Sequence, residues 1–178
     1  ALTGSRLRAE GLAERMTAAI AHRGPDGAGV FVDETAALGH RRLAILDLSD
    51  AAAQPMVSDD GALVLAFNGE IYNYLELRAE LQRLGHVFVS SGDTEVLLRA
   101  YQQWGSECVQ RFNGMWAFAL WDRRDRTLLL SRDRLGVKPL YYVEQGGQLY
   151  FASELGALRA VLDLRDANAA KLHDYLAF

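Results

Sequence analysis

The sequence predicts an α+β protein in which layered β-sheets are covered by helices. Apolar residues recur at helical spacing near both ends of the chain, and many short apolar, strand-like segments lie between them. The 178 residues contain no repeat or internal linker, so they fit one domain that removes about 70% of its unfolded surface from water. Because each element has an apolar face to cover, sheets with helices outside are the expected arrangement.

The first element is an amphipathic helix predicted over about residues 7–22. Leu12, Met16 and Ile20 recur at every fourth position and mark one face of it. The helix is expected to end before the stretch HRGPDG, whose glycine and proline residues form a strong turn cluster.

The stretch GPDGAG in this cluster has the glycine content of a phosphate-binding loop. Asp26 would repel a phosphate, however, and Pro25 removes one backbone donor. A strand rather than a helix is predicted to follow. We therefore expect a turn here and not a nucleotide site.

Three strands are predicted in the next part of the chain, over 28–33, 36–46 and 62–67, with a polar loop over 49–61. The last strand runs into Asn68-Gly69, a pair typical of a type I′ hairpin turn. The next helix follows too soon for a good returning strand. A strand that ends at a pocket is therefore the better interpretation.

A second helix is predicted to begin at Asn73, with Asn73 and Glu76 as a capping box, and to end at Gly85 in a left-handed cap. The stretch HVFVSS is then expected to be a short strand. A third helix should begin near Asp93 or Thr94 and end at Gly105, followed by a helical piece over 106–112.

The remaining elements are mostly strands. MWAFALWD is apolar on both faces, which predicts a strand covered on both sides, and TLLLSRD predicts the next one. LYYVEQGGQLYFASE predicts a hairpin around Gly146-Gly147. A helix is expected over about 156–162, and LRDANAAKLHDYLAF predicts another short helix.

The composition argues against several classes of function. The net charge is −4 and the basic residues are scattered, so no nucleic-acid surface is expected. No apolar run approaches the roughly 20 residues of a membrane span, and the first residues lack the layout of a signal peptide. A single cysteine suits a reducing cytoplasm. The four histidines lie far apart, so we expect no metal site.

Several polar residues allow two interpretations. Asp93 either caps the third helix or, kept ionised at the helix N-terminus, receives an ammonium group. Arg41 and Arg42 point to opposite faces of a strand, so one of them would form either a structural salt bridge or a bidentate contact with an acidic ligand. The stretch LSRDRLGVKPLYY is either a charged turn or an anion-contacting loop. Cys108 is expected to be a small buried hydrophobe, since no base or helix start lies beside it.

Eight segments, taken together, resemble one known pattern. They are HRGPDG, GHRRLAILDLS, QPM, LAFNGEIYNY, SSGDTEVLL, NGMWAFALWD, SRDRLGVKPLYY and FASELGAL. In this order they closely resemble the glutaminase domain of asparagine synthetases, a class II glutamine amidotransferase, over roughly residues 15 to 178. The resemblance implies the N-terminal-nucleophile hydrolase fold, a four-layer α/β/β/α sandwich of two mainly antiparallel sheets.

The resemblance also implies a catalytic machinery. In the family an N-terminal cysteine thiol attacks the side-chain amide of glutamine, and the α-amine of that cysteine acts as the base. The tetrahedral oxyanion is held by a side-chain amide and a backbone N–H, which match Asn68 and Gly69.

The same resemblance assigns the glutamine pocket. Arg42 matches the arginine that holds the α-carboxylate, and the backbone near Ile45 and Leu46 would line the pocket. Asp93 and Glu70 match the acids near the α-ammonium group. Two poles of a zwitterion would thus meet opposite charges.

This sequence departs from the family at both ends. The family opens with the cysteine and a short apolar strand, whereas Ala1 already falls in the following loop, so we expect the nucleophile and first strand to be missing from residues 1–178. Cys108 cannot substitute because it has no free α-amine. In the family a second domain adenylates a carboxylate with ATP and Mg. SSGDTE lacks the pyrophosphate-loop pattern S-G-G-x-D-S of that domain, so the synthetase half is expected outside this sequence and no cofactor is expected within it.

The expected function is hydrolysis of L-glutamine to glutamate and ammonia for an adjoining ATP-dependent amide synthetase, with asparagine made from aspartate. The expected partners are L-glutamine, the synthetase domain of the same protein and, in some assemblies, a second copy of the chain. Two alternatives remain open: a non-catalytic binding or docking domain that has lost its cysteine, and a glutaminase that serves a different acceptor.

Overall fold

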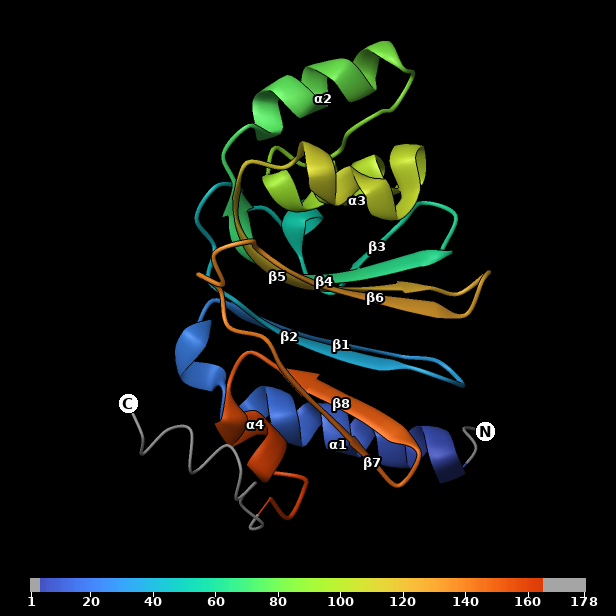
Figure 1. Ribbon diagram of the computed structural model, residues 1–178, viewed down its shortest axis with the longest axis vertical. Helices are drawn as coiled ribbons and strands as arrows, with labels where there is room; N and C mark the ends of the chain where they lie inside the picture. The colour runs from blue at the N-terminus through green and yellow to red at the C-terminus, as the bar shows by residue number, and fades with distance from the viewer. Residues whose placement is uncertain (1–3, 165–178) are drawn as a thin grey trace.

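The computed structural model describes residues 4–164 as four layers stacked along the long axis of the molecule (Figure 1). Helices α2 (Tyr74–Arg83) and α3 (Asp93–Trp104) cover one face of a four-stranded sheet. The hairpin of β1 and β2 lies against the other face, and α1 (Gly4–Ala19) and α4 (Leu155–Arg159) form the outer layer beyond it. The predicted four-layer α+β architecture is confirmed.

All strand pairs among the described residues are antiparallel. The larger sheet has the order β3-β4-β5-β6, and two separate hairpins pair β1 with β2 and β7 with β8. The strands are β1 (Gly27–Val32), β2 (Ala37–Arg42), β3 (Met56–Val57), β4 (Leu63–Ile71), β5 (Gly114–Asp122), β6 (Thr127–Arg132), β7 (Tyr141–Gln145) and β8 (Gln148–Ala152). Three short 3₁₀ helices complete the chain: η1 (Ala21–Arg23), η2 (Asp50–Ala52) and η3 (Gly105–Arg111).

The central sheet separates two hydrophobic clusters. Leu65, Phe67 and Ile71 on one face of β4 pack toward the helices α2 and α3. Val64, from the other face, packs with Leu38 of β2 in the second cluster, which lies between the sheets. This alternation follows from the two-residue period of a strand, and it directs the even-numbered side chains of β4 toward β2.

Three local predictions were wrong. β4 does not end at residue 67, because it pairs with β5 through Asn68 and Gly69 as far as Ile71. β2 ends at residue 42 rather than 46. No strand forms over 86–91, where the backbone N–H groups of Val89 and Ser90 are instead bound by the Glu95 carboxylate.

The predicted start of α2 is confirmed, but the predicted capping box is wrong. Asn73 precedes the helix, yet its side chain makes no capping hydrogen bond. Its amide instead donates to the Arg111 carbonyl and accepts from the Asn113 backbone N–H, which ties α2 to the segment before β5. The left-handed Gly85 after α2 is confirmed, with φ of 96°.

The strand β3 forms within the segment 49–61, for which the sequence predicts a polar loop, whereas the other elements match the sequence prediction in type and order. They include α1, the turn at GPDG, α3 ending at Gly105, the helical piece η3, the β5–β6 pair, the β7–β8 hairpin and α4. The short helix expected over the last residues lies outside the described part of the chain. Within residues 4–164, no helix combines the length and apolar character needed to cross a membrane.

Candidate functional site

The candidate site lies where β2 and β4 face each other across the space between the sheets. Along β2 the side chains of Leu38, His40 and Arg42 share one face, and Leu38 is only 1% exposed. Along β4 the face that carries Val64 also carries Asn68. Apolar residues therefore occupy the middle of this interface, and polar residues occupy the end at which both strands finish, on the left in Figure 1.

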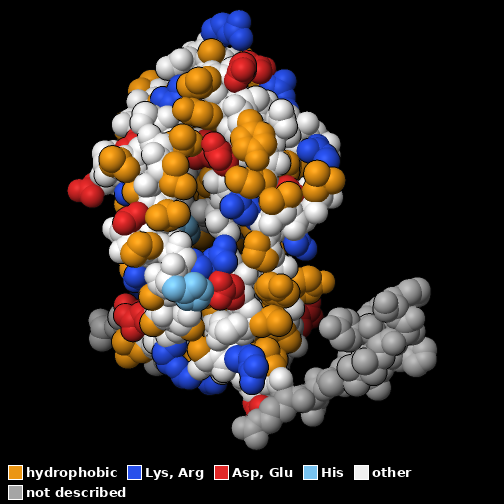
Figure 2. Space-filling model, turned by 90° about the vertical axis from the view of Figure 1, so that its left-hand side faces the viewer, with side chains coloured by type: hydrophobic (Ala, Val, Ile, Leu, Met, Phe, Trp, Pro, Cys, Tyr) orange, Lys and Arg blue, Asp and Glu red, His pale blue; other side chains and the backbone are white. Residues whose placement is uncertain are grey.

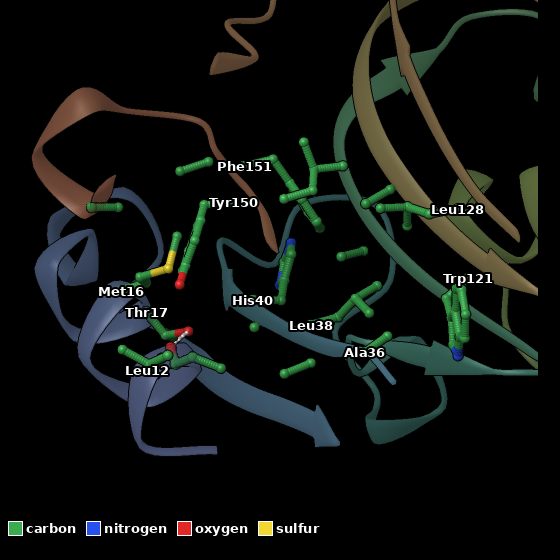
Figure 3. Close-up of a pocket in the computed structure, with 18 of the residues that line it drawn as sticks. Leu12, Met16, Thr17, Ala36, Leu38, His40, Trp121, Leu128, Tyr150 and Phe151 are labelled. Atoms are coloured by element: carbon green, nitrogen blue, oxygen red, sulfur yellow. Dashed lines mark hydrogen bonds between the residues drawn. The ribbon is translucent and has the colours of Figure 1, made fainter. Parts of the chain in front are cut away.

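A cavity of about 740 Å³ adjoins this interface (Figure 3). Its lining comes from α1, β2, the central sheet and β8, with Leu12 and Met16 on the α1 side and Asn68 on the β4 side. Protein interiors normally hold few voids larger than one water molecule, which occupies about 30 Å³ in the liquid. A space of this size between packed layers is therefore large enough to hold a further group.

His40 lies in the middle of the cavity lining, with Tyr150 and Met16 on one side and Leu38 on the other (Figure 3). Its Nε2 atom lies 3.0 Å from the backbone carbonyl oxygen of Phe67, the residue before Asn68. Burial, followed by the positive charge of Arg42, lowers the pKa of His40 to about 4. The imidazole is therefore neutral near pH 7.

Asn68 directs its side chain to the cavity, where its Nδ2 donor is buried and has no hydrogen-bond partner among the described residues. The direction of the neighbouring Gly69 N–H follows from the backbone N–H groups of β4, which point alternately to the two edges of the strand. The Phe67 N–H binds the Gln54 side chain and the Ile71 N–H binds Asp93, both on the edge away from β5. Because alternate residues direct their backbone groups to the same edge, the Gly69 N–H points to this edge as well.

Gly69 is required by the close approach of β4 and β5. A β-carbon at this position would lie 2.3 Å from the Met115 carbonyl oxygen and 2.8 Å from the Trp116 α-carbon. Both neighbours are backbone atoms of the paired strand, so they cannot move aside without disturbing the sheet. The glycine therefore keeps the strand paired directly beside Asn68.

Arg42 holds the loop that follows β2. Its Nη1 donates to the Ser49 carbonyl at 3.0 Å, and its Nη2 donates to the Asp47 carbonyl. The Nε of Arg41, on the opposite face, donates to the Gly24 carbonyl. The two arginines thus point to opposite faces as predicted, but neither forms an ion pair with an acidic side chain of the described residues. A guanidinium has five N–H donors, so Arg42 retains capacity for a carboxylate.

Asp93 is the first residue of α3 and is only 6% exposed. Its Oδ2 accepts the Ile71 backbone N–H at 2.9 Å, which joins the start of α3 to the end of β4. Burial raises the pKa of Asp93, and the nearby charge of Glu70 adds to this effect. Two carboxylates close together at a buried position favour an approaching cation.

The two residues predicted to line the pocket through their backbone are less enclosed. Ile45 and Leu46 lie on the loop after β2 with exposed fractions of 73% and 40%, so their side chains do not form a pocket wall. Cys108 is fully buried in η3, and burial raises the pKa of its thiol to about 12, as expected for an unreactive cysteine. No group of three or more metal-binding side chains occurs in the part of the chain that the structure describes.

In the loop after β6, the charged carboxylate of Asp133 is hydrogen-bonded by backbone N–H groups of the protein itself. The Asp133 carboxylate accepts backbone N–H groups from Trp116, Leu135, Val137 and Lys138. Burial opposes ionisation of Asp133, but these hydrogen bonds outweigh it and lower the pKa. These contacts favour the charged turn over the anion-contacting loop.

The polar site residues at the ends of β2 and β4 therefore lie on one side of the molecule. Figure 2 shows this side, where acidic and basic side chains lie around a hollow in the middle of the face. The sequence interpretation did not single out His40, which lines the cavity, because it considered the histidines only as metal ligands. Its position two residues before Arg42, on the same strand face, was the available signal.

Comparison with known proteins identifies the family of the chain. Residues 2–178 match the family described as "Glutamine amidotransferase domain". Asparagine synthetase [glutamine-hydrolyzing] 1 of Bacillus subtilis is 41% identical over 169 residues, which cover 95% of this chain and 27% of the relative. Asparagine synthetase B of Escherichia coli is 46% identical over 138 residues, covering 77% of this chain and 24% of the relative. The chain thus spans about a quarter of the length of these two relatives.

A solved structure shares the architecture. Glutamine phosphoribosylpyrophosphate amidotransferase from Bacillus subtilis superposes with a TM-score of 0.73 at 25% identity, covering 85% of this chain and 41% of the other.

Proposed function

Because the chain belongs to the glutamine amidotransferase domain family, we propose that it forms the site where L-glutamine is hydrolysed to glutamate and ammonia. The observation that carries this proposal is a pair of donors on consecutive residues of β4. Among the described residues, Asn68 Nδ2 is buried without a partner beside the cavity, and the Gly69 N–H points to the edge of β4 away from β5. Two preorganised donors side by side form the type of site that stabilises a developing oxyanion.

The proposed chemistry begins with a cysteine thiolate that adds to the side-chain carbonyl carbon of glutamine. The carbonyl oxygen becomes an oxyanion, which accepts hydrogen bonds from Asn68 and Gly69. When the carbonyl re-forms, the carbon–nitrogen bond breaks and ammonia leaves with a proton supplied by the α-amine. A water molecule then hydrolyses the thioester to release glutamate and the thiol.

The zwitterionic end of glutamine would be held by residues around the oxyanion donors. Arg42 has unused N–H donors for the α-carboxylate, and Asp93 with Glu70 offers negative charge to the α-ammonium group. The backbone near Ile45 and Leu46 would complete the pocket. These assignments follow the family resemblance, and the proximity of Asp93 to Glu70 supports them.

We further propose that the nucleophile reaches the site on an extended segment that occupies the cavity. Consecutive residues of β2 and of β8 line the cavity, as is typical of a strand whose backbone edge faces a space. Each of these strands belongs to a two-stranded hairpin. A strand inserted between them would join both hairpins into one sheet and fill the apolar space beside Leu12 and Leu38. The segment that carries the family's N-terminal cysteine has the required extended, apolar character.

The acceptor of the ammonia is proposed from the named relatives. The relatives called asparagine synthetases are 41% and 46% identical, against 25% for the phosphoribosylpyrophosphate amidotransferase, which favours a synthetase partner domain that makes asparagine with ATP and Mg. The cytoplasm is the proposed compartment, and homodimerisation is a further possibility within this proposal. A different acceptor, or a non-catalytic docking role, is the alternative.

The test is ammonia release from glutamine by the full-length protein, after mass spectrometry has identified its N-terminal residue. Asn68→Ala should lower kcat by about 10²-fold or more with a smaller effect on KM. A folded protein with an exposed N-terminal cysteine and no glutaminase activity would contradict the proposal. Aspartate-dependent formation of asparagine and AMP then tests the acceptor separately.

A further inference from the structure

His40 is a half-buried titratable residue that lines the cavity and that the proposed chemistry does not use. Within the described residues, His40 Nδ1 and Asn68 Nδ2 are both buried side-chain atoms without a hydrogen-bond partner, and both residues line the same cavity. Leaving a buried polar group unpaired costs about 1–3 kcal/mol. Two such atoms beside one cavity indicate that the group in the cavity supplies their partners.

The hydrogen-bonding role of each atom can be deduced. The Phe67 carbonyl can only accept, so His40 Nε2 must carry the proton that joins them at 3.0 Å. In the neutral ring, Nδ1 is then an acceptor. The Nδ2 of Asn68 is a donor. The cavity lining therefore includes one acceptor, on His40, and one donor, on Asn68.

The contact with Phe67 also links His40 to the oxyanion donors. Phe67 O and Asn68 N belong to the same peptide group, which is planar. The Phe67 N–H, which belongs to the preceding peptide group, binds the Gln54 side chain on the same edge, so both peptide groups that flank the Phe67 α-carbon are held. Holding them fixes the direction in which the Asn68 side chain leaves the strand.

We propose that His40 is a positioning residue for glutamine hydrolysis, in which Nε2–H holds the peptide that aims Asn68 and Nδ1 accepts an N–H from an amide group in the cavity. This inference rests on the proposed glutaminase function. An amide is the complementary chemistry, because its carbonyl oxygen accepts from Asn68 and its N–H donates to His40. The amide belongs either to the glutamine side chain or to the backbone of the extended segment.

Two substitutions of His40 distinguish the hydrogen bond made by Nε2 from the one made by Nδ1. His40→Gln places an amide nitrogen near the position of Nε2, so it can still donate to Phe67 but has no acceptor at Nδ1. His40→Phe removes both interactions. His86→Gln is the matched control, because His86 does not line the cavity and its imidazole contacts the Gln103 side chain instead.

The experiment measures glutaminase kcat and KM of the full-length protein and its melting temperature with and without glutamine. We expect His40→Phe to lower kcat by about 10²-fold, the typical effect of a 1 Å misplacement, and His86→Gln to match the parent. If the amide is glutamine's, His40→Gln weakens glutamine binding without changing the melting temperature of the free protein. If it belongs to the segment, His40→Gln lowers that melting temperature.

Nitrogen-15 NMR of labelled histidine provides a readout that does not depend on activity. A neutral ring protonated at Nε2, with Nδ1 accepting a hydrogen bond, is the expected signature at pH 7. A ring protonated at Nδ1, or variants with parental kcat, KM and melting temperature, would overturn the inference. An inactive parent protein would overturn the proposed function instead, while the NMR result still tests the hydrogen bonds of His40.

Discussion

Asp47 is bound to Ser91, forty-four residues further along the chain, by two hydrogen bonds. The Oδ2 atom of Asp47 accepts the Ser91 backbone N–H at 2.6 Å and the Ser91 hydroxyl at 3.0 Å. Its other oxygen accepts two hydrogen bonds from Ser49. This carboxylate joins the loop held by Arg42 to the segment that leads into Asp93, so the proposed binding sites for the two poles of glutamine share one frame.

Asp47→Ala should therefore weaken glutamine binding although Asp47 is not proposed to touch glutamine. Loss of charge-assisted hydrogen bonds that position Arg42 and Asp93 should raise KM by about 10-fold, with a smaller change in kcat. Steady-state kinetics measure this, with the exposed Asp50→Ala as the control in the same region. Equal effects of the two substitutions would show that the link is not needed.

Asp93→Asn should separate binding from stability. Burial raises the pKa of Asp93, so the folded state holds its proton more tightly than the unfolded chain does. The ionised carboxylate therefore costs stability above its unfolded pKa, and the neutral amide removes that cost while its oxygen still accepts the Ile71 N–H. We expect an unchanged or higher melting temperature and a KM raised by about 10-fold or more.

The measurement for Asp93→Asn is thermal unfolding with and without glutamine. Glutamine should raise the melting temperature of the parent protein more than that of the variant, since a ligand stabilises only the state it binds. A variant with parental KM and a lower melting temperature would show that Asp93 acts only as a helix-start residue.

Gly69→Ala should destabilise the fold. The new β-carbon meets backbone atoms of β5 at 2.3 Å and 2.8 Å, and overpacking of this kind typically costs about 1–3 kcal/mol. Gly11→Ala in α1 is the matched control, because nothing lies within 4 Å of its β-carbon position, and there alanine should stabilise the helix by about 0.5–1 kcal/mol. Urea unfolding of both variants checks the opposite signs.

Stability should fall as the pH is lowered from about 6.5 to 4, with His40 contributing. Burial and then Arg42 lower the pKa of His40 from 6.5 to about 4, so the unfolded chain binds a proton in this window that the folded protein does not. The full shift corresponds to about 3 kcal/mol. The difference in free energy of unfolding between pH 7 and pH 4.5 should be smaller in His40→Gln. Identical pH dependence in both proteins would contradict the assignment.

Local sequence signals predicted the elements whose structure depends on local interactions. The helix α3 follows from an amphipathic run that begins at Asp93 and ends at Gly105, where φ is 58°. The β7–β8 hairpin follows from Gly146-Gly147, whose φ angles are 62° and 72°. In both cases the conformational preference lies within the segment itself.

The wrong predictions concern segments whose structure depends on distant partners. Asn68-Gly69 has the local preference of a turn, but its nine-residue strand gains a continuous ladder with β5. The stretch 86–91 has the composition of a strand, yet Glu95 takes its backbone N–H groups. Pairing between distant segments overrides local propensity here.

The sequence alone determined the family resemblance, the layered α+β class, the order of the elements and the candidate residues Arg42, Asn68, Gly69 and Asp93. These depend on residue identity and spacing along the chain. Only the tertiary structure decided that Asn68 and His40 share one cavity, that the Gly69 N–H leaves the sheet at its unpaired edge, and that Arg42 and Asp93 are tied together through Asp47. The reason is physical: hydrogen bonds such as that from His40 to Phe67 join residues 27 positions apart, and only the packing of one sheet on another brings such atoms together.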